Sequence, residues 1–228
     1  MQLTSKQAVL EYLQSQNFTT VLDAPSGNGW LAAGLSGRAV LDGIDLYATA
    51  PGYRHVWTHD LNFPLPPDCG SYDLICCCEG IEHVGNPLLL LGEFHRRLAA
   101  GGLLIVTTPN VWYPQARLQY LLRGFFPSFP CLTGKIILGT HMHITPWSWP
   151  QLYLCLKLAG FRGMELVSEP LSKAKHLHEH LLAIPARVYC RGRLRRAASE
   201  EEKSFWETAT TDAALLGRHL IVAARKSG

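Results

Sequence analysis

The chain has 228 residues, of which 47% are hydrophobic and 17% are charged. This composition excludes a mainly disordered chain, and the length suits one domain with a substantial core. The first residues lack the apolar segment of a secretory signal, and no stretch approaches the ~18 consecutive apolar residues that span a bilayer. A formal net charge of +3 is too small to indicate a nucleic-acid binder. We therefore expect a soluble cytoplasmic protein without a nucleic-acid partner.

The cysteines indicate a reduced interior rather than a disulfide framework. Seven are present, an odd number, and three of them are consecutive at Cys76, Cys77 and Cys78 inside an apolar run. Neighbouring side chains on a strand point to opposite faces, so these three cannot form a set of bridges. We expect buried thiols.

The hydrophobic pattern alternates between strand-like and helix-like segments along the first half of the chain. Thr4 and Gln7 form a capping pattern for a first helix that ends near Gln14. Strand-like runs follow at 18–22, 39–44, 55–58, 72–77 and 103–107, and helix-like segments at 30–35 and 87–98. Such alternation predicts a parallel sheet covered by helices on both faces.

The pattern changes after residue 110. An aromatic and proline-rich stretch at 112–130 looks irregular, a helix is expected at about 150–158, and strands are expected at 164–167 and 219–223. The late strands fit an antiparallel edge. We predict an α/β, Rossmann-like, doubly wound sheet of seven strands, mostly parallel with an antiparallel last strand, in one domain over 1–228 with an insertion or lid at 111–147.

A basic cluster lies in the last third of the chain. Its members are Arg187, Arg191, Arg193, Arg195 and Arg196. Ser199 and the three glutamates that follow it form a helix start directly afterwards, which favours a solvated connection. The alternative is an anionic substrate or an anionic lipid surface, which leaves open a peripheral membrane contact.

A glycine turn follows the first predicted strand. Gly27 and Gly29 open the next helix, which is the geometry that brings backbone amides close to a nucleotide-like ligand. With Ala32 and with Asp45, eighteen residues beyond Gly27, the turn also matches the dinucleotide pattern of an NAD(P)-dependent reductase. Asp23 argues against the reductase, because a carboxylate there would repel a pyrophosphate and would suit a ligand with an ammonium and a sulfonium.

The segment 21–29, Val-Leu-Asp-Ala-Pro-Ser-Gly-Asn-Gly, resembles the first motif of class I S-adenosylmethionine-dependent methyltransferases. Pro25 stands where that family usually has its first glycine. The resemblance implies that S-adenosylmethionine is the cofactor and that Asp23, Pro25, Ser26, Gly27 and Gly29 contribute to binding it.

The later motifs of that family follow in order. Asp45 resembles the acidic residue that binds both ribose hydroxyls, and Asp60 and Leu61 resemble the pair at the adenine. Residues 72–84, which include Glu79, resemble the fourth-strand motif, and residues 95–106 resemble the fifth. The resemblance covers about residues 15–168, and it implies that Glu79 also lies at the cofactor.

The acceptor is expected over the carboxyl ends of the fourth and fifth strands, near Glu79, His83 and residues 108–110. The aromatic stretch at 112–130 either closes over an apolar or lipid-linked acceptor or packs as an accessory helix on the sheet edge. We expect a methyltransferase that acts on a small-molecule, lipid-linked or sugar-linked acceptor, at oxygen. The alternatives are the reductase and a catalytically silent cofactor-binding module on the same fold.

Glu79, Glu82 and His83 are spaced so that one helical turn would bring two carboxylates and an imidazole together. This spacing resembles the metal-binding segment of ubiquinone-pathway O-methyltransferases and small-RNA 2′-O-methyltransferases, in which a downstream histidine completes the site. His141 and His143 are the candidates here. One hypothesis is a divalent metal held by Glu79, Glu82, His83 and His143. The other is metal-free, with His83, His141 or His143 as a general base or acceptor-positioning residue.

Overall fold

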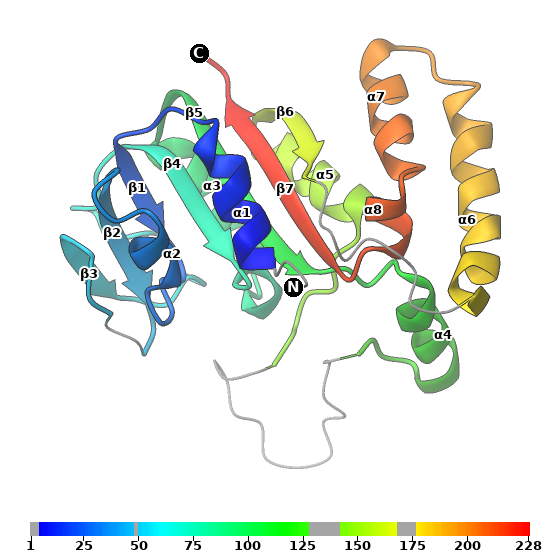
Figure 1. Ribbon diagram of the computed structural model, residues 1–228, viewed down its shortest axis with the longest axis horizontal. Helices are drawn as coiled ribbons and strands as arrows, with labels where there is room; N and C mark the ends of the chain where they lie inside the picture. Colours follow the sequence, from blue (N-terminus) through cyan, green and yellow to red (C-terminus); the bar gives the residue numbers. More distant parts are fainter. Residues whose placement is uncertain (1–4, 48–49, 128–141, 168–176) are drawn as a thin grey trace.

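The computed structural model describes residues 5–47, 50–127, 142–167 and 177–228. Its centre is a seven-stranded sheet in the order β3-β2-β1-β4-β5-β7-β6 (Figure 1). The strands are β1 Thr20–Asp23, β2 Val40–Asp45, β3 His55–Thr58, β4 Tyr72–Cys78, β5 Leu98–Pro109, β6 Phe161–Leu166 and β7 His219–Lys226. Strands β1 to β5 are parallel, and β7 pairs antiparallel with both β5 and β6. The predicted fold class is confirmed, with β6 rather than β7 at the edge.

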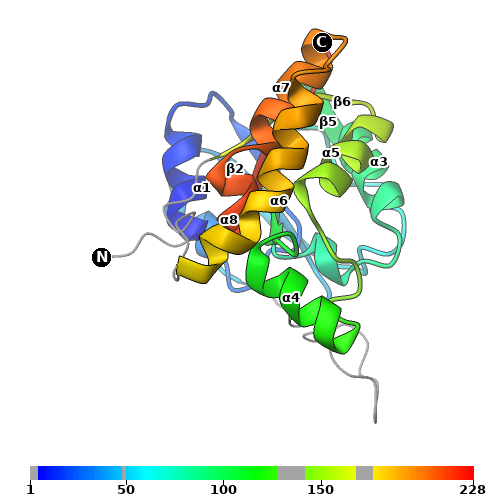
Figure 2. The ribbon, with the colours of Figure 1, turned by 90° about the vertical axis from the view of Figure 1, so that its right-hand side faces the viewer.

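Helices cover both faces of this sheet (Figures 1 and 2). Helices α1 (Ser5–Gln14) and α2 (Trp30–Gly34) pack on one face through Val9, Leu13 and Leu31. Helices α3 (Pro87–Arg97) and α5 (Trp149–Leu158) pack on the other face. The remaining helices described between β6 and β7 are α6 Leu177–Leu194, α7 Glu200–Ala209 and α8 Asp212–Leu216.

The cysteines of β4 divide between the two cores. Cys76 and Cys78 belong to the core beneath α1 and α2, whereas Cys77 faces the core beneath α3 and α5. All three are buried and free, which confirms the expectation of reduced thiols for this run. Because the strand alternates and both faces are covered, its apolar sequence is continuous.

The stretch that looked irregular in sequence contains a helix in its first half, which agrees with the alternative of an accessory helix. Helix α4 runs from Pro114 to Arg123, directly after β5. Pro114 fits because the first turn of a helix needs no amide hydrogen there, and Gly124 ends the helix with a φ of 76°. Among the described residues, no helix is both long and apolar enough to cross a membrane.

Candidate active site

The turn after β1 is held in place by hydrogen bonds from its own backbone amides. Ser26 is buried, and its amide donates a 2.9 Å hydrogen bond to the carbonyl of Ile44 at the end of β2. Gly27 and Gly29 both adopt positive φ, 51° and 75°. At Gly29 a Cβ would also come within 2.8 Å of the Cβ of Ala50, so both the backbone and the space require glycine.

Asp45 joins this turn to the end of β2. One carboxylate oxygen accepts a 2.9 Å hydrogen bond from the amide of Gly27, and the other accepts a 2.9 Å bond from the amide of Tyr47. The side chain is nearly buried. Backbone donors therefore fix the carboxylate at the carboxyl edge of the sheet, where parallel strands place ligands.

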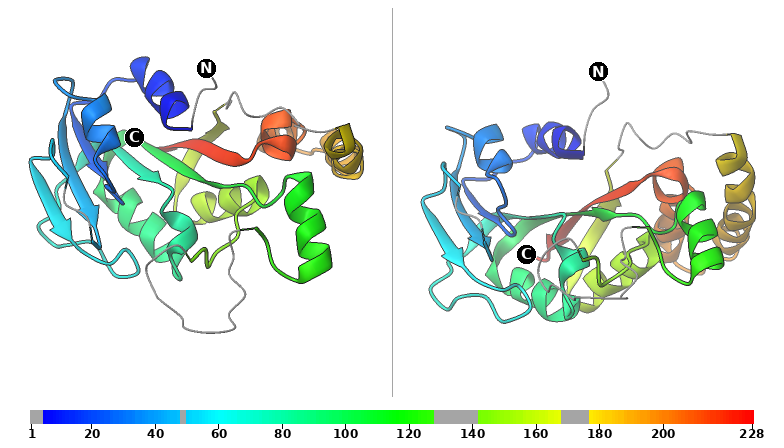
Figure 3. Two further views of the ribbon diagram at one scale, coloured as in Figure 1. Left: turned by 60° about the horizontal axis from the view of Figure 1, so that its bottom comes forward. Right: turned by 90° about the horizontal axis from the view of Figure 1, so that it is seen from below.

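Two cavities meet at Asp45, and both include Asp45 and Pro25 in their walls. The first has a volume of about 310 Å³ and is also lined by Lys6, Gly27 and Glu79. The second has a volume of about 170 Å³ and is lined by residues that follow β2, β3 and β4: Leu46, Tyr47, His59, Asp60, Leu61, Asn62, Gly80, His83 and Val84. This edge of the sheet faces the reader in the right-hand view of Figure 3. Together the cavities form a bent cleft suited to an extended ligand.

Asp23 supports this cleft from behind. Its side chain is fully buried, accepts a 2.5 Å hydrogen bond from the hydroxyl of Tyr53, and is absent from the walls of both cavities. Burial raises the pKa of Asp23 to about 7, against the lowering effect of the Tyr53 hydrogen bond. Asp23 thus shapes the turn from inside the protein, and its carboxylate does not face the cleft.

Glu79 follows β4 in an unusual backbone conformation. Its φ of 52° is the only positive value among the described residues other than glycine. Thr107 at the end of β5 donates a 3.0 Å hydrogen bond to one carboxylate oxygen, and the other lies 3.7 Å from Nε2 of His219. The carboxylate is therefore held between β5 and β7, at the wall of the first cavity.

Three metal-ligating side chains converge beside the second cavity. One donor atom each from Glu82, His83 and His143 lies within 4.8 Å of the others. Oε1 of Glu82 accepts no hydrogen bond within the described part of the chain and lies 3.9 Å from Nε2 of His83, while Oε2 accepts a bond from Thr108. Burial, with a contribution from Glu79, raises the pKa of Glu82 to about 8. We call these three residues the Glu82 cluster.

The histidines of the Glu82 cluster are oriented by the backbone. Nδ1 of His83 lies 2.8 Å from the carbonyl of Met142, which selects the tautomer that leaves Nε2 with a lone pair. The two imidazoles meet edge to face with centroids 5.0 Å apart. Burial lowers the pKa of His143, with smaller contributions from His83 and His219, so His143 is held neutral.

The predicted turn from Glu79 to His83 differs from the observed one. Only residues Ile81–His83 form a turn, a short 3-10 helix, and Glu79 lies before it. The structure therefore brings Glu82, His83 and His143 together but places Glu79 outside this cluster. His141 lies outside the described residues.

The predicted cofactor residues divide into two sets. Most line the cleft: Pro25, Gly27, Asp45, Asp60, Leu61 and Glu79. Asp23, Ser26 and Gly29 lie behind it. Sequence reasoning missed Lys6, Thr107 and His219. His219 begins β7, and because β7 pairs antiparallel with β5, His219 lies opposite Pro109 at the same edge as the cleft. The strand pattern contained that signal, since the first residue of an antiparallel neighbour meets the last residue of its partner.

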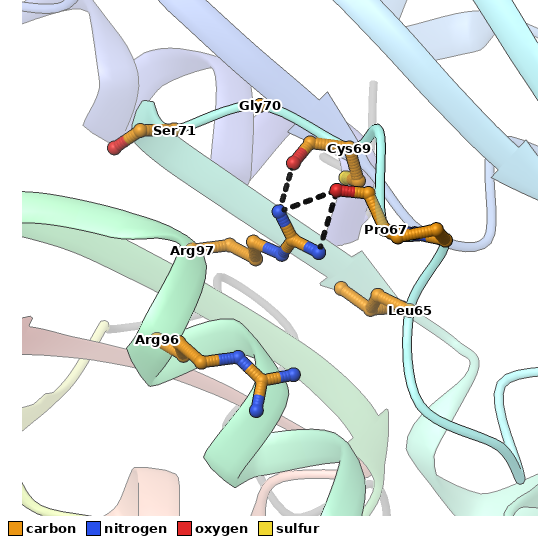
Figure 4. Close-up of a pocket in the computed structure, with 7 residues that line it drawn as sticks. All are labelled: Leu65, Pro67, Cys69, Gly70, Ser71, Arg96 and Arg97. Atoms are coloured by element: carbon orange, nitrogen blue, oxygen red, sulfur yellow. Dashed lines mark hydrogen bonds between the residues drawn. The ribbon is translucent and has the colours of Figure 1, made fainter.

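A larger cavity, of about 610 Å³, lies elsewhere, at the start of β4 (Figure 4). Its arginines already have partners in the protein. Arg97 donates hydrogen bonds to the carbonyls of Pro66, Pro67 and Cys69, and Arg96 pairs with Glu93. The guanidinium of Arg97 ties the loop before β4 to helix α3, so the arginine there has a structural role.

Comparison with known proteins finds one family model that matches most of the chain. The family model described as a methyltransferase domain matches residues 3–166. The chain belongs to this family. That membership confirms the resemblance to class I S-adenosylmethionine-dependent methyltransferases and disfavours the reductase.

Individual methyltransferases are similar to this chain at low sequence identity. A ubiquinone biosynthesis O-methyltransferase of Pseudomonas paraeruginosa is 28% identical over 106 residues, which are 40% of this chain and 44% of that protein. The match thus spans less than half the length of this relative. The fold resembles that of human N-acetylserotonin methyltransferase in complex with S-adenosylmethionine, with a TM-score of 0.53, 16% identity, and coverage of 99% of this chain and 52% of that one. It also resembles the 1,6-didemethyltoxoflavin-N1-methyltransferase of Burkholderia thailandensis, with a TM-score of 0.53, 14% identity, and coverage of 98% and 77%.

Proposed function

We propose that this protein transfers the methyl group of S-adenosylmethionine to a hydroxyl oxygen of a small-molecule, lipid-linked or sugar-linked acceptor. The observation that carries the proposal is the position of the Glu82 cluster. His83 lines the second cavity, and Glu79 lines the first, so groups able to take a proton border the cofactor cleft. The name of the ubiquinone-pathway relatives, O-methyltransferase, supports oxygen as the target.

The cofactor would occupy both cavities. Asp45, at their junction, suits the two ribose hydroxyls, because an ionised carboxylate is a strong acceptor for paired donors. Asp60 and Leu61 in the second cavity suit the adenine. Lys6 in the first cavity, whose ammonium lies 5.3 Å from the ring centroid of Trp30, suits the carboxylate of the methionine half.

The chemistry is an in-line displacement. The acceptor oxygen forms a bond to the methyl carbon as the carbon–sulfur bond breaks, and the sulfur keeps the electron pair of that bond. The hydroxyl proton passes to an imidazole of the Glu82 cluster. His83 is suited to receive it at Nε2, since Nδ1 faces a carbonyl, and the lowered pKa of His143 keeps that ring neutral. Positioning of the two reactants supplies most of the acceleration.

The Glu82 cluster also fits a divalent cation. Oε1 of Glu82 is buried without a hydrogen-bond donor among the described residues, and because burial raises the pKa of Glu82, its ionised form there needs a positive partner. Glu82, His83 and His143 would hold the cation, a two-histidine, one-carboxylate set common for transition metals. A bound cation would lower the pKa of the acceptor hydroxyl. The contact of His83 with the Met142 carbonyl would then orient the ring as a ligand.

Ligand titration tests cofactor binding, and turnover measurements test methyl transfer to oxygen. Isothermal titration with S-adenosylhomocysteine should show one site per chain, with no binding of NAD. Turnover is measured with deuterated S-adenosylmethionine on a panel of phenols, sugars and prenyl-linked alcohols, with the product identified by mass spectrometry. His83→Ala and His143→Ala should each lower turnover by about 10²- to 10⁴-fold and retain S-adenosylhomocysteine binding. Absence of S-adenosylhomocysteine binding, or methylation at nitrogen or carbon alone, would contradict the proposal.

A further inference from the structure

Helix α6 presents an apolar stripe to solvent. It lies on the outside of the molecule, in front in Figure 2, and its buried stripe consists of Glu179, Ala183 and Cys190. The residues at Leu177, Leu181, Ile184 and Val188 follow the spacing of one helical face. All four are exposed, Leu181 by 60% and Val188 by 64%. A helix that only packed against α4, α7 and α8 would have polar residues in those positions.

The same face continues into a group of arginines. Arg191 lies one turn further along the same helical face, and Arg195 and Arg196 follow in the turn after α6 ends at Leu194. Within the described residues, none of these three side chains forms an ion pair or a hydrogen bond, whereas Arg187 pairs with Asp212 at 2.5 Å. Arg191 therefore shares the face of the apolar stripe, and Arg195 and Arg196 lie beyond the end of that face.

Helix α6 exposes no acidic side chain, and the glutamates that begin α7, Glu200 and Glu201, pair with Lys203 and Lys157. Glu179 is the only acidic residue of α6, and it is buried in an ion pair with Arg218. Arg218 precedes His219, and its guanidinium lies 4.2 Å from the ring centroid of Tyr113. The ion pair therefore anchors the first half of α6 beside the acceptor end of the cleft.

Helix α4 adds apolar side chains next to this end of α6. Arg117 of α4 donates a 3.0 Å hydrogen bond to the carbonyl of Leu182, and the two helices lie side by side in Figures 1 and 2. Leu121 and Leu122 are among the most exposed apolar residues described. Because α4 follows β5 directly, this surface borders the edge of the sheet that holds the cleft. We call the α6 stripe, its free arginines and the two leucines of α4 the α6 surface.

We infer that the α6 surface docks on an anionic lipid bilayer and that the acceptor reaches the cleft from that bilayer, an inference that rests on the proposed methyl transfer. An amphipathic helix with exposed aliphatic residues, a basic end and no exposed acid matches the chemistry of an anionic interface. The aliphatic stripe enters the interfacial region, and the arginines contact phosphate groups. The ion pair of Glu179 with Arg218 keeps the cleft at a fixed position relative to the membrane.

Vesicle co-sedimentation of the full chain tests this inference. The protein should bind vesicles of phosphatidylcholine mixed with phosphatidylglycerol, less so as salt increases, and should not bind phosphatidylcholine alone. The double variant Arg191→Gln/Arg195→Gln should lower the partition constant by about thirtyfold, at about fivefold per arginine. Leu181→Glu/Val188→Glu should abolish binding. Leu158→Glu, an equally exposed leucine on α5, is the control and should bind as the wild type does.

Three outcomes would overturn the inference. The first is equal sedimentation with both kinds of vesicle, and the second is binding that the α6 variants leave unchanged. The third is a wild-type dimer without vesicle binding that Leu181→Glu/Val188→Glu converts to a monomer, since a second copy would then cover the stripe. S-adenosylhomocysteine titration of the same samples separates the two proposals. Cofactor binding without vesicle binding refutes only the docking, whereas loss of cofactor binding in the wild type refutes the proposed function.

Discussion

The carboxylate of Asp45 accepts a 2.9 Å hydrogen bond from the amide of Gly27, which ties the end of β2 to the turn after β1. Asp45 is therefore ordered before any ligand arrives, and the turn depends on it for its position. A ligand that donates to this carboxylate pays little for ordering the side chain. This contact links the conformation of the turn to cofactor affinity.

Replacement of Asp45 by Ala should weaken S-adenosylmethionine binding by roughly 1.5–3 kcal/mol, the contribution of hydrogen bonds to a charged group. Isothermal titration measures the loss. Glu207→Ala, which removes an exposed carboxylate from α7, is the matched control and should bind as the wild type does. An unchanged dissociation constant in Asp45→Ala would refute the assignment to the ribose.

Gly80 and Pro25 lie in close contact across the cleft. A Cβ on Gly80 would come within 2.2 Å of Cδ of Pro25, so Gly80→Ala should displace the turn after β1. We expect a lower Tm and weaker S-adenosylhomocysteine binding. Gly92→Ala is the control, because nothing lies within 4 Å of its Cβ position on α3, and it should be neutral or stabilising by about 0.5–1 kcal/mol. Equal behaviour of the two variants in thermal unfolding would show that the contact is relaxed in solution.

Most of the strands could be predicted because their signal is local. Strand β3 begins and ends as expected at His55 and Thr58, since the apolar run is short and bounded by polar residues. Helix α4 was expected only as one of two alternatives, because prolines and aromatic residues obscure its helical period, although Pro114 is tolerated in the first turn. Boundaries were less accurate at β5, which is longer than its apolar run.

The site could be predicted where motifs or residue types indicated it, as they did for Asp45 and for His143 with Glu82. Asp45 and Gly27 were associated with one another through motif spacing. His219 was not, because only the antiparallel pairing of β7 with β5 brings it beside Glu79, and that pairing joins residues more than a hundred positions apart. A regular helical turn was expected to bring Glu79 to the metal site, but its positive φ directs the carboxylate toward Thr107 instead.

Asp23 should make stability depend on pH. Its pKa is raised by burial to about 7, so the folded state keeps the proton to higher pH than the unfolded state. The stabilisation that the protonated Asp23 carboxyl contributes is fully present below the pKa of about 4 that aspartate has in the unfolded chain. It is lost as the pH rises through about 7. The Tm of Asp23→Asn relative to wild type should therefore rise between about pH 4 and 7 and be constant above that range.

Asp68→Asn is the control for that titration. The Asp68 carboxyl is exposed, and the hydrogen bond from Trp57 lowers its pKa, so its effect should be flat over the same pH range. Parallel Tm curves for Asp23→Asn and wild type would show that the Asp23 carboxyl is solvated in the folded protein.

The aromatic residues after α4 should affect the acceptor rather than the cofactor. Phe126 stacks on Tyr120 with ring centroids 4.4 Å apart, and the guanidinium of Arg123 lies 5.2 Å from the ring of Phe125. If the insertion at 111–147 covers the acceptor, Phe125→Ser/Phe126→Ser should raise the acceptor KM severalfold and leave the S-adenosylhomocysteine dissociation constant unchanged. A large fall in Tm would show instead that these rings form part of the core.

Metal binding at the Glu82 cluster distinguishes the metal-assisted mechanism from the metal-free mechanism with a histidine base. If it holds a divalent cation, chelated wild-type protein should gain Tm when Mn²⁺ or Zn²⁺ is added, by roughly 5–10 °C at a hundredfold excess over the dissociation constant. Glu82→Gln and His143→Ala should bind the ion at least about tenfold more weakly. His180→Ala removes an exposed histidine of α6 and should respond as the wild type does.

Turnover of the chelated protein, measured with and without added metal, is the second test of the two mechanisms. With a bound cation, exhaustive chelation should abolish methyl transfer, and the added ion should restore it, while S-adenosylhomocysteine binding stays constant because the Asp45 end of the cleft is unaffected. Activity that survives chelation, in protein that contains no metal by elemental analysis, would eliminate the cation. His83 and His143 would then act as bases, because a neutral imidazole accepts the hydroxyl proton directly. Turnover should in that case fall only at a pH below the usual imidazole range, because burial lowers the pKa of His143, and His143→Ala should remove most of that dependence.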